Sequence, residues 1–222
     1  MKTQTIETCQ LSNGLTLVIE PMANVQSIAF SFLVPSGCIY DPEKGNGTAA
    51  VLSDLITRGA GERNSKELSI ALDNLGIQHS ESVGSQNIAF TGATLAENLQ
   101  ESLKVYADII LKPHLPESEF PATMMGLEQV LKAQEDEPRQ KIMQELRKRC
   151  FDHPWGLSAD GTLEDIPNIT HETVLKHYQT CFRPNGSIIG IAGNIRDRRC
   201  EMGKALFQRS HRILGRTFYQ AK

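Results

Sequence analysis

Two short runs near the start of the chain alternate apolar and polar positions, which is the period of β-strands. They cover residues 15–20, after an Asn-Gly turn, and 25–35, which ends in Pro-Ser-Gly. The Asn-Gly pair between alternating residues also suits a hairpin. Residues 48–57 then place their apolar positions at helical spacing, and Gly59 stops them. We therefore expect two strands followed by a helix.

The next stretch predicts another helix, a pair of strands and a further helix. A capping box opens the helix at 64–75, whose apolar positions form one stripe, and a glycine follows as the C-cap. The strands are expected at 77–83 and 86–93, with a Gly-Ser turn between them. A second capping box at 94–97 is expected to open a helix over 99–110.

Prolines at 113–116 break the chain, and three helices are expected beyond them at 117–135, 141–150 and 170–181. Residues 187–192 form an apolar run typical of a buried strand. Strands in antiparallel pairs, interleaved with amphipathic helices, indicate an α+β fold: a mainly antiparallel sheet with helices packed on one face. A doubly wound parallel sheet is the alternative, and the hairpin expected at 77–93 disfavours it.

Composition is ordinary for a globular protein, at 40% hydrophobic and 22% charged residues in a chain of 222. The net charge of −3 gives no reason to expect nucleic acid or membrane as a partner. Five scattered cysteines form no C-x-x-C pair, so neither a disulfide framework nor a cysteine zinc site is indicated. The N-terminal residues contain no apolar targeting segment, and we expect a cytoplasmic protein.

The end of the chain differs in charge from the rest. Residues 196–222 hold eight Lys/Arg and two acidic residues, so they carry +6 and residues 1–195 carry −9 of the total of −3. We expect one domain over 1–195 and a basic C-terminal tail. The tail reads either as a basic surface helix with a frayed end or as the truncated or aberrant end of a longer gene product.

Five motifs occur in an order that resembles one peptidase family. They are NGLTLVIEP (13–21), NGTAAVLSDLITRG (46–59), EDEP (135–138), HPWG (153–156) and the segment from FRPN to AGN (182–194). In this order they resemble the pitrilysin/insulinase zinc metallopeptidases, or inverzincins, which include the mitochondrial processing peptidase. The resemblance implies the fold of one domain of a mitochondrial processing peptidase-type metallohydrolase.

The family's zinc chemistry resides in H-x-x-E-H on a helix and in a later glutamate. By this resemblance the ligand positions are Ala50, Asp54 and Val130, and the general-base position is Ser53. None of the four carries the family residue, and H-x-x-E-H occurs nowhere else in the chain. We therefore expect no catalytic residue, no metal ligand and no cofactor, although zinc is expected for the family.

Two other sites at these positions can be considered. Asp54 with Glu128 or Glu135 could form a weak divalent site, but hard cations need several convergent oxygens, and a solvated helix face is the simpler interpretation. Ser53 as a nucleophile would need a histidine and an oxyanion hole nearby. The six histidines show no ligand spacing; they are His79, His114, His153, His171, His177 and His211.

By the same resemblance, the strand at 77–83 corresponds to the edge strand that binds substrate peptide, which implicates Ser80, Glu81 and Ser82. We expect a noncatalytic subunit that pairs with an active H-x-x-E-H peptidase subunit, or with a second half-domain, and helps to bind peptide or form the chamber. One alternative is an active metalloendopeptidase with unconventional metal ligands. Another is a purely structural interaction module.

Overall fold

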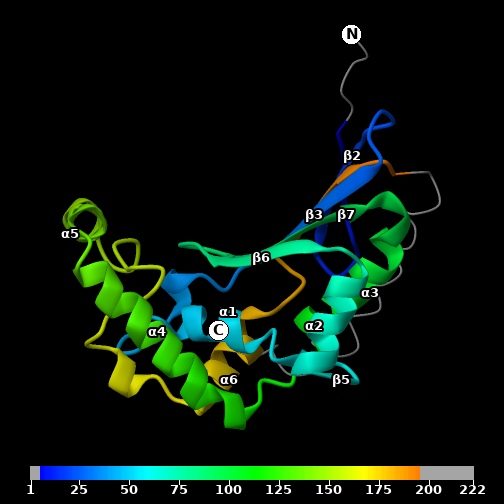
Figure 1. Cartoon of the computed structure of the whole chain (residues 1–222). Helices are drawn as coiled ribbons and strands as arrows, with labels where there is room; N and C mark the ends of the chain where they lie inside the picture. The colour runs from blue at the N-terminus through cyan, green and yellow to red at the C-terminus, as the bar shows by residue number, and fades with distance from the viewer. Residues whose placement is uncertain (1–5, 196–222) are drawn as a thin grey trace.

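The structure is a computed structural model that describes residues 6–195 (Figure 1). The expectations for the tail at 196–222 lie outside the described residues. The main sheet has six strands in the order β1-β2-β8-β3-β7-β6. Its strands are β1 (Glu7–Gln10), β2 (Thr16–Pro21), β3 (Ser27–Val34), β6 (Gln78–Val83), β7 (Ile88–Leu95) and β8 (Ile188–Gly193).

The sheet is mainly antiparallel, as predicted, with one parallel pair. β8 runs parallel to β2 and antiparallel to β3, so the last described strand lies between two of the first. The β6–β7 hairpin confirms the strand pair expected at 77–93. β1, which pairs with β2, has no counterpart in the sequence prediction. Its four residues are mostly exposed and polar, so they lack the apolar alternation that marks a half-buried strand.

Six helices surround the sheet in the described part of the chain, and Figure 1 shows α1, α2 and α6 together below it. They are α1 (Thr48–Leu55), α2 (Ser65–Asn74), α3 (Leu99–Leu111), α4 (Phe120–Glu135), α5 (Pro138–Cys150) and α6 (His171–Cys181). A small hairpin joins β4 (Gly59–Ala60) to β5 (Arg63–Asn64). Short 3-10 turns are η1 (Cys38–Tyr40), η2 (Ala96–Asn98), η3 (Glu117–Glu119) and η4 (Ile166–Asn168). Within residues 6–195, no helix combines the length and the apolar character that crossing a bilayer requires. The α+β class predicted from the sequence is confirmed.

The core lies between the sheet and the helices. Side chains of β3 alternate strictly, and Phe30 and Phe32 point inward onto Tyr106 of α3. The ring of Tyr106 meets Phe30 edge-on at 4.9 Å between centroids and stacks on Phe32 at 5.6 Å. Phe30 lies opposite Gly92 of β7, where a methyl group would collide with the phenyl ring, so glycine is required for this close packing.

One predicted helix start is confirmed and another is wrong. Asn64 and Glu67 form the reciprocal hydrogen bonds of a capping box at α2, at 3.0 and 2.9 Å. Thr94 does not cap a helix, because β7 continues through it and pairs it with Ile28 of β3. Its hydroxyl instead donates to the carbonyl of Leu75, at 2.6 Å. Strand pairing here overrides the local capping signal.

Candidate functional site

The helix that carries the family's zinc motif positions, α1, begins at a carboxylate from the preceding turn. Asp41 accepts hydrogen bonds from the backbone N–H of Ala49 on Oδ1 (2.8 Å) and of Gly47 on Oδ2 (2.9 Å). The side-chain amide of Asn46 also donates to Oδ2, at 3.2 Å. A negative charge at this end is favoured by the helix dipole. Gly47 has φ of 112°, which a glycine adopts without strain.

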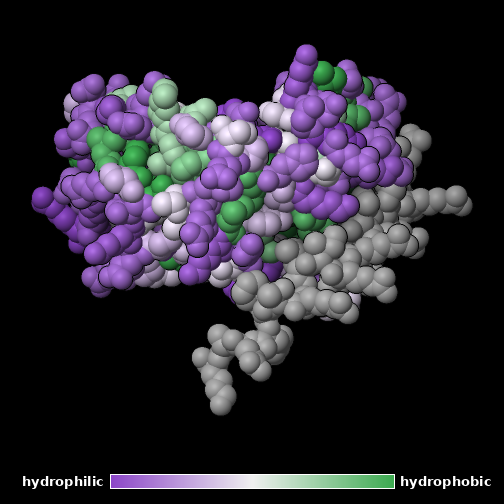
Figure 2. All heavy atoms as spheres, turned by 90° about the horizontal axis from the view of Figure 1, so that it is seen from below, coloured by the Kyte–Doolittle hydropathy of each residue, from purple (hydrophilic) through white to green (hydrophobic). Residues whose placement is uncertain are grey.

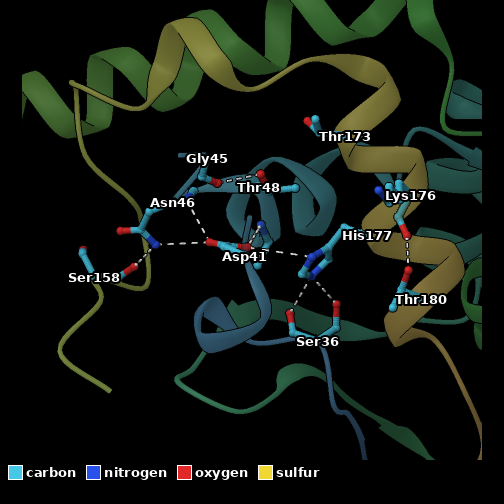
Figure 3. A network of polar contacts seen from close by, with 12 residues as sticks. Ser36, Asp41, Gly45, Asn46, Thr48, Ser158, Thr173, Lys176, His177 and Thr180 are labelled. Atoms are coloured by element: carbon cyan, nitrogen blue, oxygen red, sulfur yellow. Dashed lines mark hydrogen bonds and ion pairs between the residues drawn. The ribbon is translucent and has the colours of Figure 1, made fainter. Parts of the chain in front are cut away.

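Asp41 belongs to a buried polar network with His177 of α6 and Ser36 at the end of β3 (Figure 3). Nε2 of His177 lies 2.9 Å from the hydroxyl of Ser36, and Nδ1 lies 4.0 Å from Asp41 Oδ1. Burial raises the pKa of Asp41 to about 6 and lowers the pKa of His177 below its usual value. Although it contains Ser, His and Asp, the network is not a nucleophilic site, because Ser36 is 0% exposed. It fixes the start of α1 against α6.

The two catalytic-motif positions with polar side chains on α1 are already engaged within the protein. The hydroxyl of Ser53 donates to the carbonyl of Ala50, at 2.9 Å. Asp54 accepts from Arg58 on both oxygens, at 3.1 and 3.0 Å, and from the hydroxyl of Thr123 at 2.8 Å. Asp54 therefore forms an ion pair and links α1 to α4.

On α4, Thr123 contacts Asp54, while Val130 lies two helical turns further along and is 50% exposed. Glu128 is paired with Lys132 at 2.7 Å. Among residues 6–195, no three His, Cys, Asp or Glu side chains gather closely enough to hold a metal ion. The carboxylate of Asp54 is thus the one family ligand position with a strong metal donor, and an arginine already neutralises it.

β6 lies at one edge of the described sheet, beside α1. At the hairpin turn, the N–H of Gly84 donates to the carbonyl of Asn87 at 2.7 Å. Since hydrogen-bonded pairs alternate along an antiparallel ladder, the backbone groups of Ser80 and Ser82 face β7. The residues whose backbone N–H and C=O groups point away from β7, toward the open edge, are His79, Glu81 and Val83.

The side chains of the three predicted peptide contacts are divided between the two faces of the sheet. Ser80 pairs with Thr91, and their hydroxyls lie 2.8 Å apart. Glu81 projects to the opposite face, where its carboxylate lies 3.3 Å from Nδ1 of His79. Ser82 is exposed on the same side as Ser80. The assignment of these residues to peptide binding remains a prediction.

Sequence reasoning missed the network around Asp41. The carboxylate caps a helix that begins seven residues later, which matches no local capping signature, and its partner His177 has no ligand spacing to any other histidine. The one signal was the Asn46-Gly47 pair, which marks a turn with a left-handed residue.

Comparison with known proteins agrees with this geometry. Residues 17–159 match the family model described as insulinase (peptidase family M16). The chain belongs to the insulinase family, M16. An uncharacterized zinc protease of Rickettsia bellii is 24% identical over 187 residues, covering 84% of this chain and 45% of that protein. The mitochondrial-processing peptidase subunit beta of Saccharomyces cerevisiae is 27% identical over 182 residues, covering 78% and 37%.

Solved structures of the family share the fold. The peptidase M16 inactive domain from Pseudomonas fluorescens superimposes with a TM-score of 0.84 at 16% identity, covering 98% of this chain and 53% of that one. A protease from Helicobacter pylori gives a TM-score of 0.86 at 20% identity, covering 93% and 50%. This M16 chain spans about half the length of the relatives it matches.

Proposed function

We propose that this chain is a noncatalytic M16 protein that pairs with an active zinc peptidase and helps to hold peptide or form the peptidase chamber. The observation that carries this proposal is the chemistry at the family's site positions. Ala50 and Val130 have no donor atoms, and Ser53 has no carboxylate with which to activate water. Asp54 is committed to Arg58 and Thr123.

Zinc does not fit this donor set. A catalytic zinc site uses three protein ligands and an open position, whereas these positions supply one carboxylate. That carboxylate would have to exchange an arginine at 3.0 Å for the metal. We therefore include no cofactor in the proposed function.

Peptide binding does not require the metal. An extended peptide can add to a sheet edge through main-chain hydrogen bonds, with its side chains giving specificity. The outward backbone groups of His79, Glu81 and Val83 provide such an edge beside α1. This arrangement supports a peptide-holding role for β6.

Relatives named as subunits support pairing with another chain. The yeast relative is a subunit of the mitochondrial processing peptidase. The cytochrome b-c1 complex subunit 1 of Caenorhabditis elegans is 26% identical over 189 residues, covering 84% of this chain and 40% of that protein. That similarity favours a second candidate function, a structural subunit without peptide affinity. Four free cysteines, Cys9, Cys38, Cys150 and Cys181, fit a reducing compartment, and we keep the cytoplasm as the proposed location.

Binding of labelled peptides tests the function at β6. Anisotropy of fluorescein-labelled peptides of about ten residues would be compared for the wild type, Glu81→Pro and Glu81→Ala. Glu81→Pro removes an outward N–H without breaking the β6–β7 ladder, and should weaken binding about tenfold. Glu81→Ala keeps that N–H and is the matched control.

Three results would decide among the candidates. Loss of binding in Glu81→Pro alone supports peptide holding at β6. Absence of binding by the wild type, with association to an H-x-x-E-H subunit retained, favours the structural role. Peptide cleavage by the purified chain that a chelator blocks, with stoichiometric zinc, would instead establish an active metallopeptidase.

A further inference from the structure

α5 is a helix of 13 residues with no buried side chain. It lies against α4 through polar contacts, such as Gln144 to Gln134 at 2.9 Å. Arg147 donates to the carbonyl of Trp155 at 3.2 Å and to the hydroxyl of Ser85 at the β6–β7 turn. Helices of this length obtain most of their stability by packing an apolar face. Within the described structure, the apolar face of α5 remains unpacked.

That face is a stripe of Ile142, Met143 and Leu146, which are 65, 58 and 51% exposed. We call these three residues the α5 stripe. Phe151 and Trp155 beyond the helix add exposed aromatic surface, at 57 and 45%. Figure 2 shows apolar surface at the end of the molecule that carries α4 and α5. A pocket of ≈ 510 Å³ that Met143, Leu146 and Phe151 help to line makes this surface concave.

The two ends of α5 carry opposite charge. Glu135, Asp136 and Glu137 are exposed immediately before the helix, and Arg147, Lys148 and Arg149 form its last turn. Lys148 and Arg149 reach Glu145 only at 3.9 Å, with side chains that are 50 and 81% exposed. These charges suit the dipole of α5 itself and also leave its ends able to attract opposite charge on another molecule.

We propose that the α5 stripe is a contact surface between two copies of this chain, with the two helices antiparallel about a two-fold axis. A two-fold axis brings the same patch of each copy together, so an apolar stripe meets an apolar stripe. The antiparallel direction sets the acidic residues before one helix near the basic last turn of the other. A parallel arrangement would bring like charges together.

The proposed pairing is independent of the function proposed above and leaves the edge of β6 open. A specific interface buries about 800 Å² on each partner, which is more than one helix supplies. Phe151, Trp155 and the pocket beside the stripe provide the additional area and the concave shape. Aromatic residues at the centre of an interface contribute strongly to binding.

Sedimentation of the full chain over a range of concentrations tests the association. Leu146→Glu places a charge in the stripe and should weaken dimerisation at least about tenfold. Ile70→Glu, at an apolar residue of α2 that is 47% exposed, is the matched control and should leave dimerisation unchanged. Circular dichroism establishes that both variants fold. A wild-type chain that is monomeric, or a dimer that Leu146→Glu leaves intact, overturns the proposal.

Cross-linking tests the direction of the helices. With Cys150→Ser and Cys200→Ser in all chains, a chain carrying Arg139→Cys is mixed with one carrying Arg149→Cys. Antiparallel α5 helices bring 139 of one copy level with 149 of the other, and set equal positions about 15 Å apart. Disulfides should form in the mixture and not in either chain alone; the reverse pattern refutes the arrangement. A monomeric chain whose Leu146→Glu variant fails to bind an H-x-x-E-H subunit would assign the stripe to that partner and overturn self-association.

Discussion

Asp41 provides the sharpest test of the buried network, because its ionisation should make the folded protein less stable as the pH rises. The variant is Asp41→Asn, compared with its parent in a His177→Gln background so that the histidine does not titrate. Burial is the main cause of the raised pKa of Asp41, from 3.8 to about 6. The hydrogen bonds from Gly47, Ala49 and Asn46 act in the opposite direction and lower it.

The magnitude follows from the pKa values of the folded and unfolded chains. Between them the unfolded chain has released the proton of Asp41 and the folded chain still holds it, so stability falls as pH rises through this window. A shift of about two units corresponds to about 3 kcal/mol in total. About 2 kcal/mol of this should be lost between about pH 4.5 and about pH 7.

Urea unfolding of the two proteins across this pH range measures the effect. Since Asn does not titrate, the difference in unfolding free energy between parent and variant isolates Asp41. The difference should shrink by about 2 kcal/mol as the pH rises. A difference that grows with pH would show that the hydrogen bonds to the carboxylate outweigh its burial, and the physical account of this network would be wrong.

Three further variants test the site and its supports. Placing the family residues at the four motif positions should create a zinc site measurable by metal analysis, and a folded variant that binds no zinc contradicts the alignment; the changes are Ala50→His, Ser53→Glu, Asp54→His and Val130→Glu. Gly47→Ala should lower the free energy of unfolding by about 1–2 kcal/mol in urea titrations, because φ is 112° and a methyl group would lie 3.2 Å from the carbonyl of Asp160. Arg58→Ala should cost only about 0.5 kcal/mol by the same measurement, since its ion pair with Asp54 is partly exposed; a loss above about 2 kcal/mol would contradict this.

The sequence predicted those parts of the fold whose signals lie within a few residues of each other. The capping box of α2 spans Asn64 to Glu67, and Gly76 just beyond that helix has φ of 58°. The β6–β7 turn likewise depends on neighbouring residues. The strand β1 was missed, because four exposed residues become a strand only by pairing with β2. Thr94 shows the converse, a clear local signal overruled by pairing across the sheet.

The candidate site divides in the same way. The ion pair of Asp54 with Arg58 follows from i, i+4 spacing on a helix and could be derived from the sequence. The bond from Thr123 to Asp54 joins residues 69 positions apart, and that from His177 to Ser36 joins residues 141 apart. Such contacts depend on how α4 and α6 pack against α1, which no local pattern encodes.

The position of β8 has a consequence for the order in which the protein acquires its fold during synthesis. β8 lies between β2 and β3, so the two groups of strands, β1-β2 and β3-β7-β6, are joined through it in the described sheet. Its partner in β2, Thr16, precedes Ile188 by more than 170 residues. The nascent chain must therefore hold two incomplete sheet edges apart until almost its entire described length has left the ribosome. Contacts of such long range fold slowly, and this interval is when aggregation or capture by a chaperone would compete most with folding.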